Sequence, residues 1–263
     1  MRVKDITGAI EEFAPLSLQE KWDNSGLVIG SPEDTVTGVM VGFDCTAELI
    51  EEAVEKGCNM VVTHHPLIFK GVTSISAKDP VGAAIIAAVK NNVAIYAAHT
   101  SADKVIQGVS GDMARRLGLV DVEILEPDGE GTGLGCIGNF PKPLSADEAL
   151  AAVKEAFGLK LIRHSRPIER LISRVAVLGG SGGGDIEAAI SAGAQLYITA
   201  DVSYHKFFTP EGFMVMDIGH FESEVGIVDI FLSEIRKKFP TFASYKFAVL
   251  DGSNPVRYFG MSI

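Results

Sequence analysis

Apolar residues occur in this chain as short continuous runs that alternate with segments of helical spacing. The continuous runs have the length and composition of buried strands, and they lie at Val39–Phe43, Met60–Thr63 and Val93–Ala98. The segments of helical spacing predict amphipathic helices, and they lie at Val3–Phe13, Ala47–Lys56, Pro80–Asn91 and Gly111–Leu117. Strands that alternate with helices indicate an α/β fold with a mostly parallel or mixed sheet.

A glycine-rich segment, Glu126–Gly138, interrupts this alternation and predicts a linker. Beyond it, residues 136–140 and 159–165 read as strands, and Ser145–Phe157 reads as a helix. Ser145 and Glu148 have the spacing of a capping box, in which the two residues satisfy backbone N–H groups at the start of a helix. The alternation of strand and helix therefore resumes after the predicted linker.

The chain also contains a weak internal repeat, in which residues 39–65 align without a gap with residues 175–201. The identical pairs include Val39/Val175, Val41/Val177, Glu51/Glu187, Ala53/Ala189, Gly57/Gly193 and Thr63/Thr199. They fall on strand, helix and turn positions in register, as two related strand-helix-strand units would produce. Any two such units share part of this pattern, so a chance similarity stays open. In this register His64 and His65 correspond to Ala200 and Asp201.

Charge and cysteine content narrow the class of protein. The 34 acidic and 23 basic residues give a formal net charge of −11, which repels polyanions and makes nucleic acid an unlikely partner. The three cysteines, Cys45, Cys58 and Cys136, are widely spaced in apolar surroundings and predict buried thiols of a reducing compartment. The N-terminus has no signal-peptide core, and no apolar run reaches membrane-spanning length. We therefore expect a cytoplasmic protein without a membrane partner.

Most histidines lie in short polar segments, and three of these segments follow strand-like runs: VVTHHPLIF with His64 and His65, AAHTSAD with His99, and DIGHFESE with His220. Two of these histidines have a carboxylate four positions on, Asp103 after His99 and Glu224 after His220. Loops at strand ends let several segments converge on one point, and imidazoles with carboxylates suit transition metals. The pattern predicts a metal centre.

The adjacent pair His64 and His65 bears on the number of ions. Side chains alternate along an extended chain, so we expect the two rings to point in opposite directions. One tetrahedral ion would need a bend to bind both, whereas two neighbouring ions could each bind one. We therefore predict a dinuclear centre. His164, in LIRHSRP, is predicted to have a structural role.

The same segments carry a resemblance to a known family. WDNSGLVIG, VVTHHPLIFKG, AAHTSAD, ITADVSYH and DIGHFESE occur here in the order found in the NIF-three-like proteins, also called GTP cyclohydrolase I type 2 homologues. The resemblance covers nearly the whole chain and implies two similar, interleaved α/β domains with mixed sheets and the metal site at strand C-terminal ends. It further implies two metal ions per subunit and a toroidal homohexamer whose sites face an internal cavity. This chain resembles the short form without the central inserted domain. We expect one domain over residues 1–125 plus 225–263 with most metal ligands, and a second over 126–224.

The resemblance also implies a ligand set. His65 and Asp103 would bind one ion, His64 and His220 the other, and Glu224 would bridge both. His99 would be a further ligand or a catalytic proton-transfer group. Mixed histidine and carboxylate ligands suit two divalent ions of zinc, iron or manganese.

This sequence departs from the family pattern at two places. Ala102 replaces a bulky apolar residue, and Lys104 lies two positions after it, so the substrate could differ from that of other members. In the segment that resembles Gly-Asp-x-Lys-x-His, Ala200 and Ser203 replace the glycine and the lysine, while Asp201 and His205 remain. These last two residues would line the cavity or form structural hydrogen bonds.

The function implied is that of a metal-dependent hydrolase, which would use a metal-bound water on a nucleotide or another small cyclic amide or phosphorylated substrate. The family label makes that substrate GTP. The glycine run Gly179–Asp185 lacks the ending of a phosphate-binding P-loop, and its Asp185 would oppose an anion, so a tight structural turn is favoured over a phosphate cradle. The alternatives are a non-catalytic metal-handling hexamer and an interaction scaffold.

Overall fold

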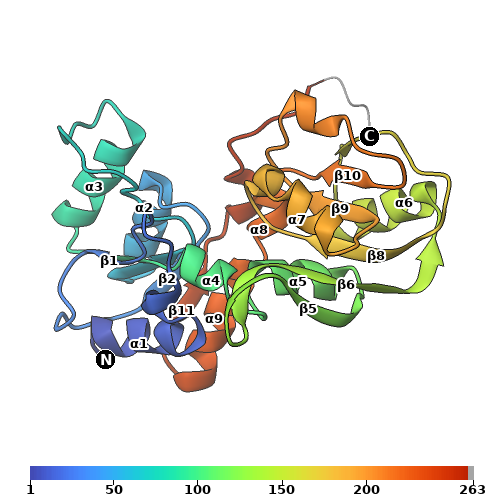
Figure 1. Ribbon diagram of the computed structural model, residues 1–263. Helices are drawn as coiled ribbons and strands as arrows, with labels where there is room; N and C mark the ends of the chain where they lie inside the picture. Colours follow the sequence, from blue (N-terminus) through green and yellow to red (C-terminus); the bar gives the residue numbers. More distant parts are fainter. Residues whose placement is uncertain (260–263) are drawn as a thin grey trace. The chain divides into compact units, whose positions relative to one another are not determined.

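The chain folds into two compact units in the computed structural model, which describes residues 1–259 (Figure 1). The first unit comprises Met1–Ala102 and Ile227–Pro255, and the second comprises Asp103–Gly226 and the described residues from Val256 on. The chain thus passes from one unit to the other and back, so the units are interleaved in sequence. Residues 103–125, 225–226 and 256–259, which the sequence analysis assigned to the first domain, group here with the second unit. The last four residues of the expected first domain, 260–263, lie outside the described residues.

The first unit has a five-stranded mixed sheet with the order β1-β4-β3-β2-β11. The strands are β1 (Gly26–Ile29), β2 (Val39–Gly42), β3 (Met60–Thr63), β4 (Ala94–Ala97) and β11 (Ser244–Lys246). The neighbours β4, β3, β2 and β11 are parallel, and β1 is antiparallel to β4. All residues of β2, β3 and β4 are buried, which explains why these strands appear as continuous apolar runs in the sequence. The three strands predicted for this part of the chain are confirmed.

Three helices of the first unit were expected from helical spacing, α1 (Val3–Phe13), α2 (Ala47–Glu55) and α3 (Pro80–Lys90). The unit also contains α9 (Ile227–Lys238) and the 3-10 turns η1 (Leu16–Leu18) and η4 (Leu250–Gly252), and the short α4 (Thr100–Asp103) spans the point where its first segment ends. Helix α2 packs against α3, and α1 packs against α9. The Thr46 hydroxyl and the Asp79 carboxylate accept hydrogen bonds from backbone N–H groups at the starts of α2 and α3.

The second unit has a six-stranded mixed sheet with the order β5-β6-β8-β9-β10-β7. The strands are β5 (Val120–Gly129), β6 (Thr132–Leu144), β7 (Arg163–His164), β8 (Ile172–Val177), β9 (Leu196–Thr199) and β10 (Met214–Asp217). The central strands β8, β9 and β10 are parallel. Side chains alternate between the two faces, so that Val175 and Val177 join one buried apolar cluster and Ala176 joins another.

Six helical elements accompany this sheet in the described part of the chain. They are α5 (Val109–Arg116), α6 (Ala146–Phe157), α7 (Ile186–Ser191) and α8 (His220–Glu224), with the 3-10 turns η2 (Gly182–Gly184) and η3 (Tyr204–Phe207). The capping box predicted from Ser145 and Glu148 is present at the start of α6. Within residues 1–259, every helix is too short or too polar to cross a bilayer.

The predicted linker at Glu126–Gly138 is wrong, because these residues form most of the β5–β6 hairpin. Their glycines serve strand geometry. Gly133 has a φ of +152°, and a Cβ atom there would lie 2.2 Å from the Glu126 carbonyl oxygen. Gly135, near the start of β6, has a φ of +70°. Glycine inside a strand permits such irregular pairing and close backbone approach, so glycine content here indicates a distorted hairpin and not a flexible connection.

The internal repeat corresponds to equivalent structure in the two units. In the first sheet Val39 pairs with Met60, and in the second Val175 pairs with Leu196, which is the same register displaced by the same offset. Each pair of parallel strands is connected through a helix, α2 or α7. Each sheet continues with a third parallel strand and then an antiparallel edge strand. These are β4 and β1 in the first sheet and β10 and β7 in the second. The fold class is therefore α/β with two similar units and two mixed sheets.

Candidate functional site

Three histidines of the first unit follow two neighbouring parallel strands. His64 and His65 come directly after β3, and His99 comes two residues after the end of β4. Because parallel strands end at the same edge of a sheet, these residues are brought to one place. Their ring nitrogens lie within 4.8 Å of one another, close enough for one metal ion to bind all three. The structure therefore brings together His64, His65 and His99, all of which the sequence singled out.

The expectation that His64 and His65 point in opposite directions is wrong. Both backbone N–H groups donate to the same acceptor, the Phe43 carbonyl oxygen, at 3.1 and 3.2 Å. The chain therefore bends after β3 and does not continue as an extended strand. As a result, the two imidazole rings lie 4.9 Å apart, measured between their centroids. This bend removes the geometric objection to both rings serving one site.

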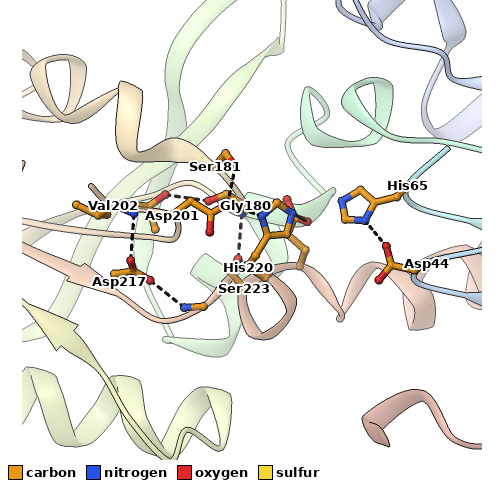
Figure 2. Close-up of polar contacts among 12 residues, drawn as sticks. Asp44, His65, Gly180, Ser181, Asp201, Val202, Asp217, His220 and Ser223 are labelled. Atoms are coloured by element: carbon orange, nitrogen blue, oxygen red, sulfur yellow. Dashed lines mark hydrogen bonds and ion pairs between the residues drawn. The ribbon is translucent and has the colours of Figure 1, made fainter. Parts of the chain in front are cut away.

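Each of the three rings is held through its Nδ1 atom. His64 Nδ1 lies 2.9 Å from the Ala98 carbonyl oxygen, which can only accept, so this nitrogen carries the proton and donates. His65 Nδ1 lies 2.7 Å from an Asp44 carboxylate oxygen (Figure 2), and His99 Nδ1 lies 2.8 Å from Asp23. Metal-binding histidines almost always donate their second ring N–H to a carbonyl or carboxylate. In this tautomer the lone pair on Nε2 is the one directed to a ligand.

Asp23 anchors His99, and sequence reasoning assigned it no role. Its side chain is fully buried, and besides His99 it accepts hydrogen bonds from the hydroxyl groups of Thr100 and Ser25, at 2.6 and 2.8 Å. Burial raises the pKa of this carboxyl, but the hydrogen bonds from His99, Thr100 and Ser25 outweigh burial and hold the pKa well below its usual range. Asp23 is therefore a carboxylate that stays ionised. Its position in the motif WDNSG was the available signal.

In the second unit, His220 and Glu224 face each other across one turn of α8. The Nε2 atom of His220 lies 3.0 Å from a Glu224 carboxylate oxygen. On the other side of the ring, Nδ1 lies 2.8 Å from Asp201, which also accepts a hydrogen bond from the Ser181 hydroxyl at 2.6 Å (Figure 2). Burial raises the pKa of Asp201, but the hydrogen bonds from Ser181 and His220 lower it below its ordinary value overall. Asp201 therefore supports His220 as Asp44 supports His65.

The backbone at Asp201 is held in an unusual conformation. Its φ is +53°, in the left-handed region that costs a residue with a Cβ atom about 1 kcal/mol. The neighbouring Val202 N–H donates to the Asp217 carboxylate at 3.0 Å, and Asp217 is buried at the end of β10 (Figure 2). Arg163 in turn pairs with Asp217 at 2.9 Å. The sheet thus fixes the segment that aims Asp201 at His220.

The glycine run after β8 packs against Glu224. Gly180 has a φ of +66°, and a Cβ atom there would lie 2.2 Å from a Glu224 carboxylate oxygen. A Cβ atom at Gly179 would lie 3.1 Å from Glu224 Cγ. The Gly180 N–H donates to the Ser223 hydroxyl at 3.0 Å, which fixes the turn to α8. These glycines are required for close approach to the carboxylate.

The structure also places the other residues that the sequence singled out. Asp103 is the last residue of α4 and belongs to the second unit. Lys104, one of the departures from the family pattern, pairs with Asp128 at 2.6 Å. His205 is exposed in η3, and His164 Nδ1 lies 2.8 Å from the Ser165 carbonyl oxygen.

Residues 1–255 match the model of the family described as Duf34/NIF3 (NGG1p interacting factor 3). The chain belongs to the DUF34/NIF3 family. A relative within it, a protein of Clostridium acetobutylicum named GTP cyclohydrolase 1 type 2 homolog, is 36% identical over 229 residues, which are 85% of each chain. A similarly named protein of Clostridium perfringens is 34% identical over 228 residues, covering 85% of this chain and 87% of the relative.

Solved structures show the same DUF34/NIF3 fold. The crystal structure of a Bacillus cereus protein related to NIF3 superimposes with a TM-score of 0.92 at 22% identity, covering 98% of this chain and 99% of the other. A Staphylococcus aureus hypothetical protein gives a TM-score of 0.89 at 26% identity with the same coverage. The resemblance found in the sequence motifs is thus confirmed at the level of family and fold.

Proposed function

We propose that this DUF34/NIF3 protein is a metal-dependent hydrolase that acts on a nucleotide or another small cyclic amide or phosphorylated substrate. The observation that carries the proposal is the cluster of His64, His65 and His99, each held in one tautomer by an acceptor on Nδ1. The names of the curated relatives, GTP cyclohydrolase 1 type 2 homolog, favour a nucleotide substrate.

The donor groups fit divalent metal ions of the zinc, iron and manganese class. Imidazole nitrogens and carboxylate oxygens both suit these ions, and the pattern of supporting carboxylates is typical of histidines that bind metal. The proposed ligands, carried over from the family resemblance, are His64, His65, Asp103, His220 and Glu224, with two ions per subunit. The supporting groups are the Ala98 carbonyl and the carboxylates of Asp44 and Asp201.

The chain's own residues would bind and orient the reacting groups. When bound, divalent ions lower the pKa of coordinated water and polarise carbonyl or phosphoryl oxygens. His99 would hold or transfer a proton at Nε2, because the ionised Asp23 carboxylate fixes its Nδ1–H. Glu224 is buried beside a turn of glycines, which limits its movement and favours a fixed role as a ligand.

The proposal is tested first by metal content, measured by elemental mass spectrometry on untagged protein. We expect near two metal ions per chain in the wild type and a clear fall in both His65→Ala and Glu224→Gln. His164→Ala is the matched control, because this histidine lies on the exposed edge strand β7 and should leave metal content unchanged. Less than half an ion per chain, unchanged by adding zinc, iron or manganese, would overturn the proposal.

Turnover separates a hydrolase from a metal-handling protein. We expect hydrolysis of GTP or of a related nucleotide in the presence of divalent metal and its loss in Glu224→Gln. Metal content near two ions per chain with no turnover on a broad panel of nucleotides and phosphoesters would instead support a non-catalytic assembly.

The resemblance further leads us to propose a homohexamer. Size-exclusion chromatography with light scattering tests this, since a monomer of 28.0 kDa would contradict it.

A further inference from the structure

Two large aromatic side chains stand exposed beside His99. Trp22, the only tryptophan of the chain, is 63% exposed, and Phe69 is 45% exposed. Aromatic rings of this size contribute strongly to a core when they are buried, so two exposed rings at one point need an explanation. Their position beside a candidate active-site histidine suggests a role in binding.

Both rings meet His99 in edge-to-face geometry. The Trp22 and His99 centroids are 5.8 Å apart with planes at 72°, and the Phe69 and His99 centroids are 5.3 Å apart with planes at 86°. Phe69 also lies 6.3 Å from the His65 ring. Edge-to-face contacts use only part of each ring, and the exposed fractions show that much of both aromatic surfaces stays available for a ligand.

The two segments that carry these rings are tied together. The Asn24 side-chain amide donates to the Ile68 carbonyl oxygen at 2.6 Å. Asn24 lies two residues after Trp22, and Ile68 directly precedes Phe69, so this hydrogen bond links the two segments. Trp22 also precedes Asp23, whose buried carboxylate is fixed by several hydrogen bonds. The rings are therefore mounted on anchored backbone, as a preorganised binding surface requires.

The chemistry of this surface indicates a class of ligand. An aromatic face stacks on the planar ring of any nucleobase, and such stacking contributes about 1–3 kcal/mol of binding free energy per base. Exposed lysines are the sequence neighbours of both aromatic residues, Lys21 before Trp22 and Lys70 after Phe69. Positive charge on the same two short segments favours a flat heteroaromatic ring that carries an anionic group.

We propose that Trp22 and Phe69 form an aromatic clamp that binds the heteroaromatic ring of a phosphorylated ligand beside His99. The proposal rests on the proposed function, because the clamp would present the ring to the groups at the three histidines. It assigns to these two residues the selection of planar substrates over aliphatic phosphoesters.

The single tryptophan makes the clamp directly observable. Wild-type fluorescence should be quenched saturably by GMP and by AMP, and ribose 5-phosphate should cause no saturable change. Phe69→Ala should weaken GMP binding about 5-fold to 150-fold, which corresponds to the loss of one stacking contact. Phe69→Tyr should restore binding, and Val72→Ala, a change at another exposed apolar residue nearby, should leave it unaltered.

Calorimetric titration of Trp22→Ala with GMP provides a second measurement, in which we expect weakening of the same size. Equal affinity for GMP and ribose 5-phosphate in the wild type, or unchanged GMP binding in both aromatic variants, would overturn the clamp. So would a fall in oligomer mass in Phe69→Ala without any quenching of the wild type by GMP, which would make these rings an assembly surface.

Metal content of the same samples distinguishes the two proposals. Bound metal without selectivity for ring-containing ligands contradicts the clamp alone, and such selectivity without bound metal contradicts the metal-dependent hydrolase alone.

Discussion

The Asp201 carboxylate accepts from His220 Nδ1 at 2.8 Å, while the opposite nitrogen of the same ring lies 3.0 Å from Glu224. Asp201 therefore fixes the tautomer and the orientation of a proposed metal ligand. Supporting groups of this kind typically change metal affinity by about 10-fold to 100-fold when they are removed. We expect Asp201→Ala to weaken metal binding by that factor, measured by competition with a metal-binding dye.

Asp201→Gly is the control for backbone strain, because glycine relieves the left-handed φ of +53° while it also removes the carboxylate. We expect it to lose as much metal affinity as Asp201→Ala. Normal affinity in the glycine variant would show that strain, and not the hydrogen bond to His220, caused the loss.

Replacement of Asp23 should destabilise the first unit. Asp23→Ala leaves His99, Thr100 and Ser25 without their shared acceptor, and each buried donor left unsatisfied costs about 1–3 kcal/mol. We expect the melting temperature to fall by at least about 4 °C. Asp44→Ala is the matched control, since Asp44 is 35% exposed and supports one histidine. Equal losses in both variants would argue against the anchoring role of Asp23.

Gly180→Ala should disturb Glu224. The added methyl group would lie 2.2 Å from a Glu224 carboxylate oxygen, in a backbone conformation with a φ of +66° that disfavours alanine. We expect reduced metal content and a lower melting temperature. Gly184→Ala, where nothing lies within 4 Å of the new Cβ atom, should behave as the wild type. If both variants bind metal normally, the glycine turn does not constrain Glu224.

The carboxyl groups of Glu126 and Asp185 predict a pH dependence of stability. Burial, the charge of Asp185 and their mutual hydrogen bond raise the pKa of Glu126 above its ordinary value. As the pH rises from about 4.5, the unfolded chain releases this proton before the folded protein does, so the free energy of unfolding decreases. Glu126→Gln cannot ionise.

We therefore expect Glu126→Gln to raise the melting temperature at pH 7 by about 2–4 °C and to have little effect near pH 4. Thermal unfolding across this range measures both. The exposed Glu130→Gln, in the turn between β5 and β6, serves as the control. A change in melting temperature that is the same at pH 4 and pH 7 would contradict the raised pKa of Glu126 as its cause.

Much of the fold could be predicted from the sequence because its central strands are buried on both faces. The runs at β2, β3 and β4 needed only hydrophobicity to be recognised. The β5–β6 hairpin could not be recognised in the same way, since its glycines are indistinguishable by composition from those of a flexible linker. Only the paired strand explains why Gly133 and Gly135 have positive φ.

Some residues of the candidate site could be predicted from the sequence, and others could not. His64, His65, His99, His220 and Glu224 are unusual residue types directly after or near strand ends, and this made them visible. Asp23 and Asp44 act through hydrogen bonds to residues 76 and 21 positions away, which no local pattern encodes. The bend at His64 and His65 depends on the Phe43 carbonyl of the neighbouring strand segment, so strand alternation alone gave the wrong orientation.

The shared register of the two sheets has an evolutionary consequence. Thr63 and Thr199 end equivalent strands, and two positions later one unit has His65 while the other has Asp201. Duplication and fusion of one ancestral unit would produce this arrangement, with an identical group first present at both positions. In such a fused chain, a substitution in one copy would not impose the same substitution in the other. One copy could then supply a proposed metal ligand, His65, while the other supplied Asp201, the acceptor that orients the proposed ligand His220.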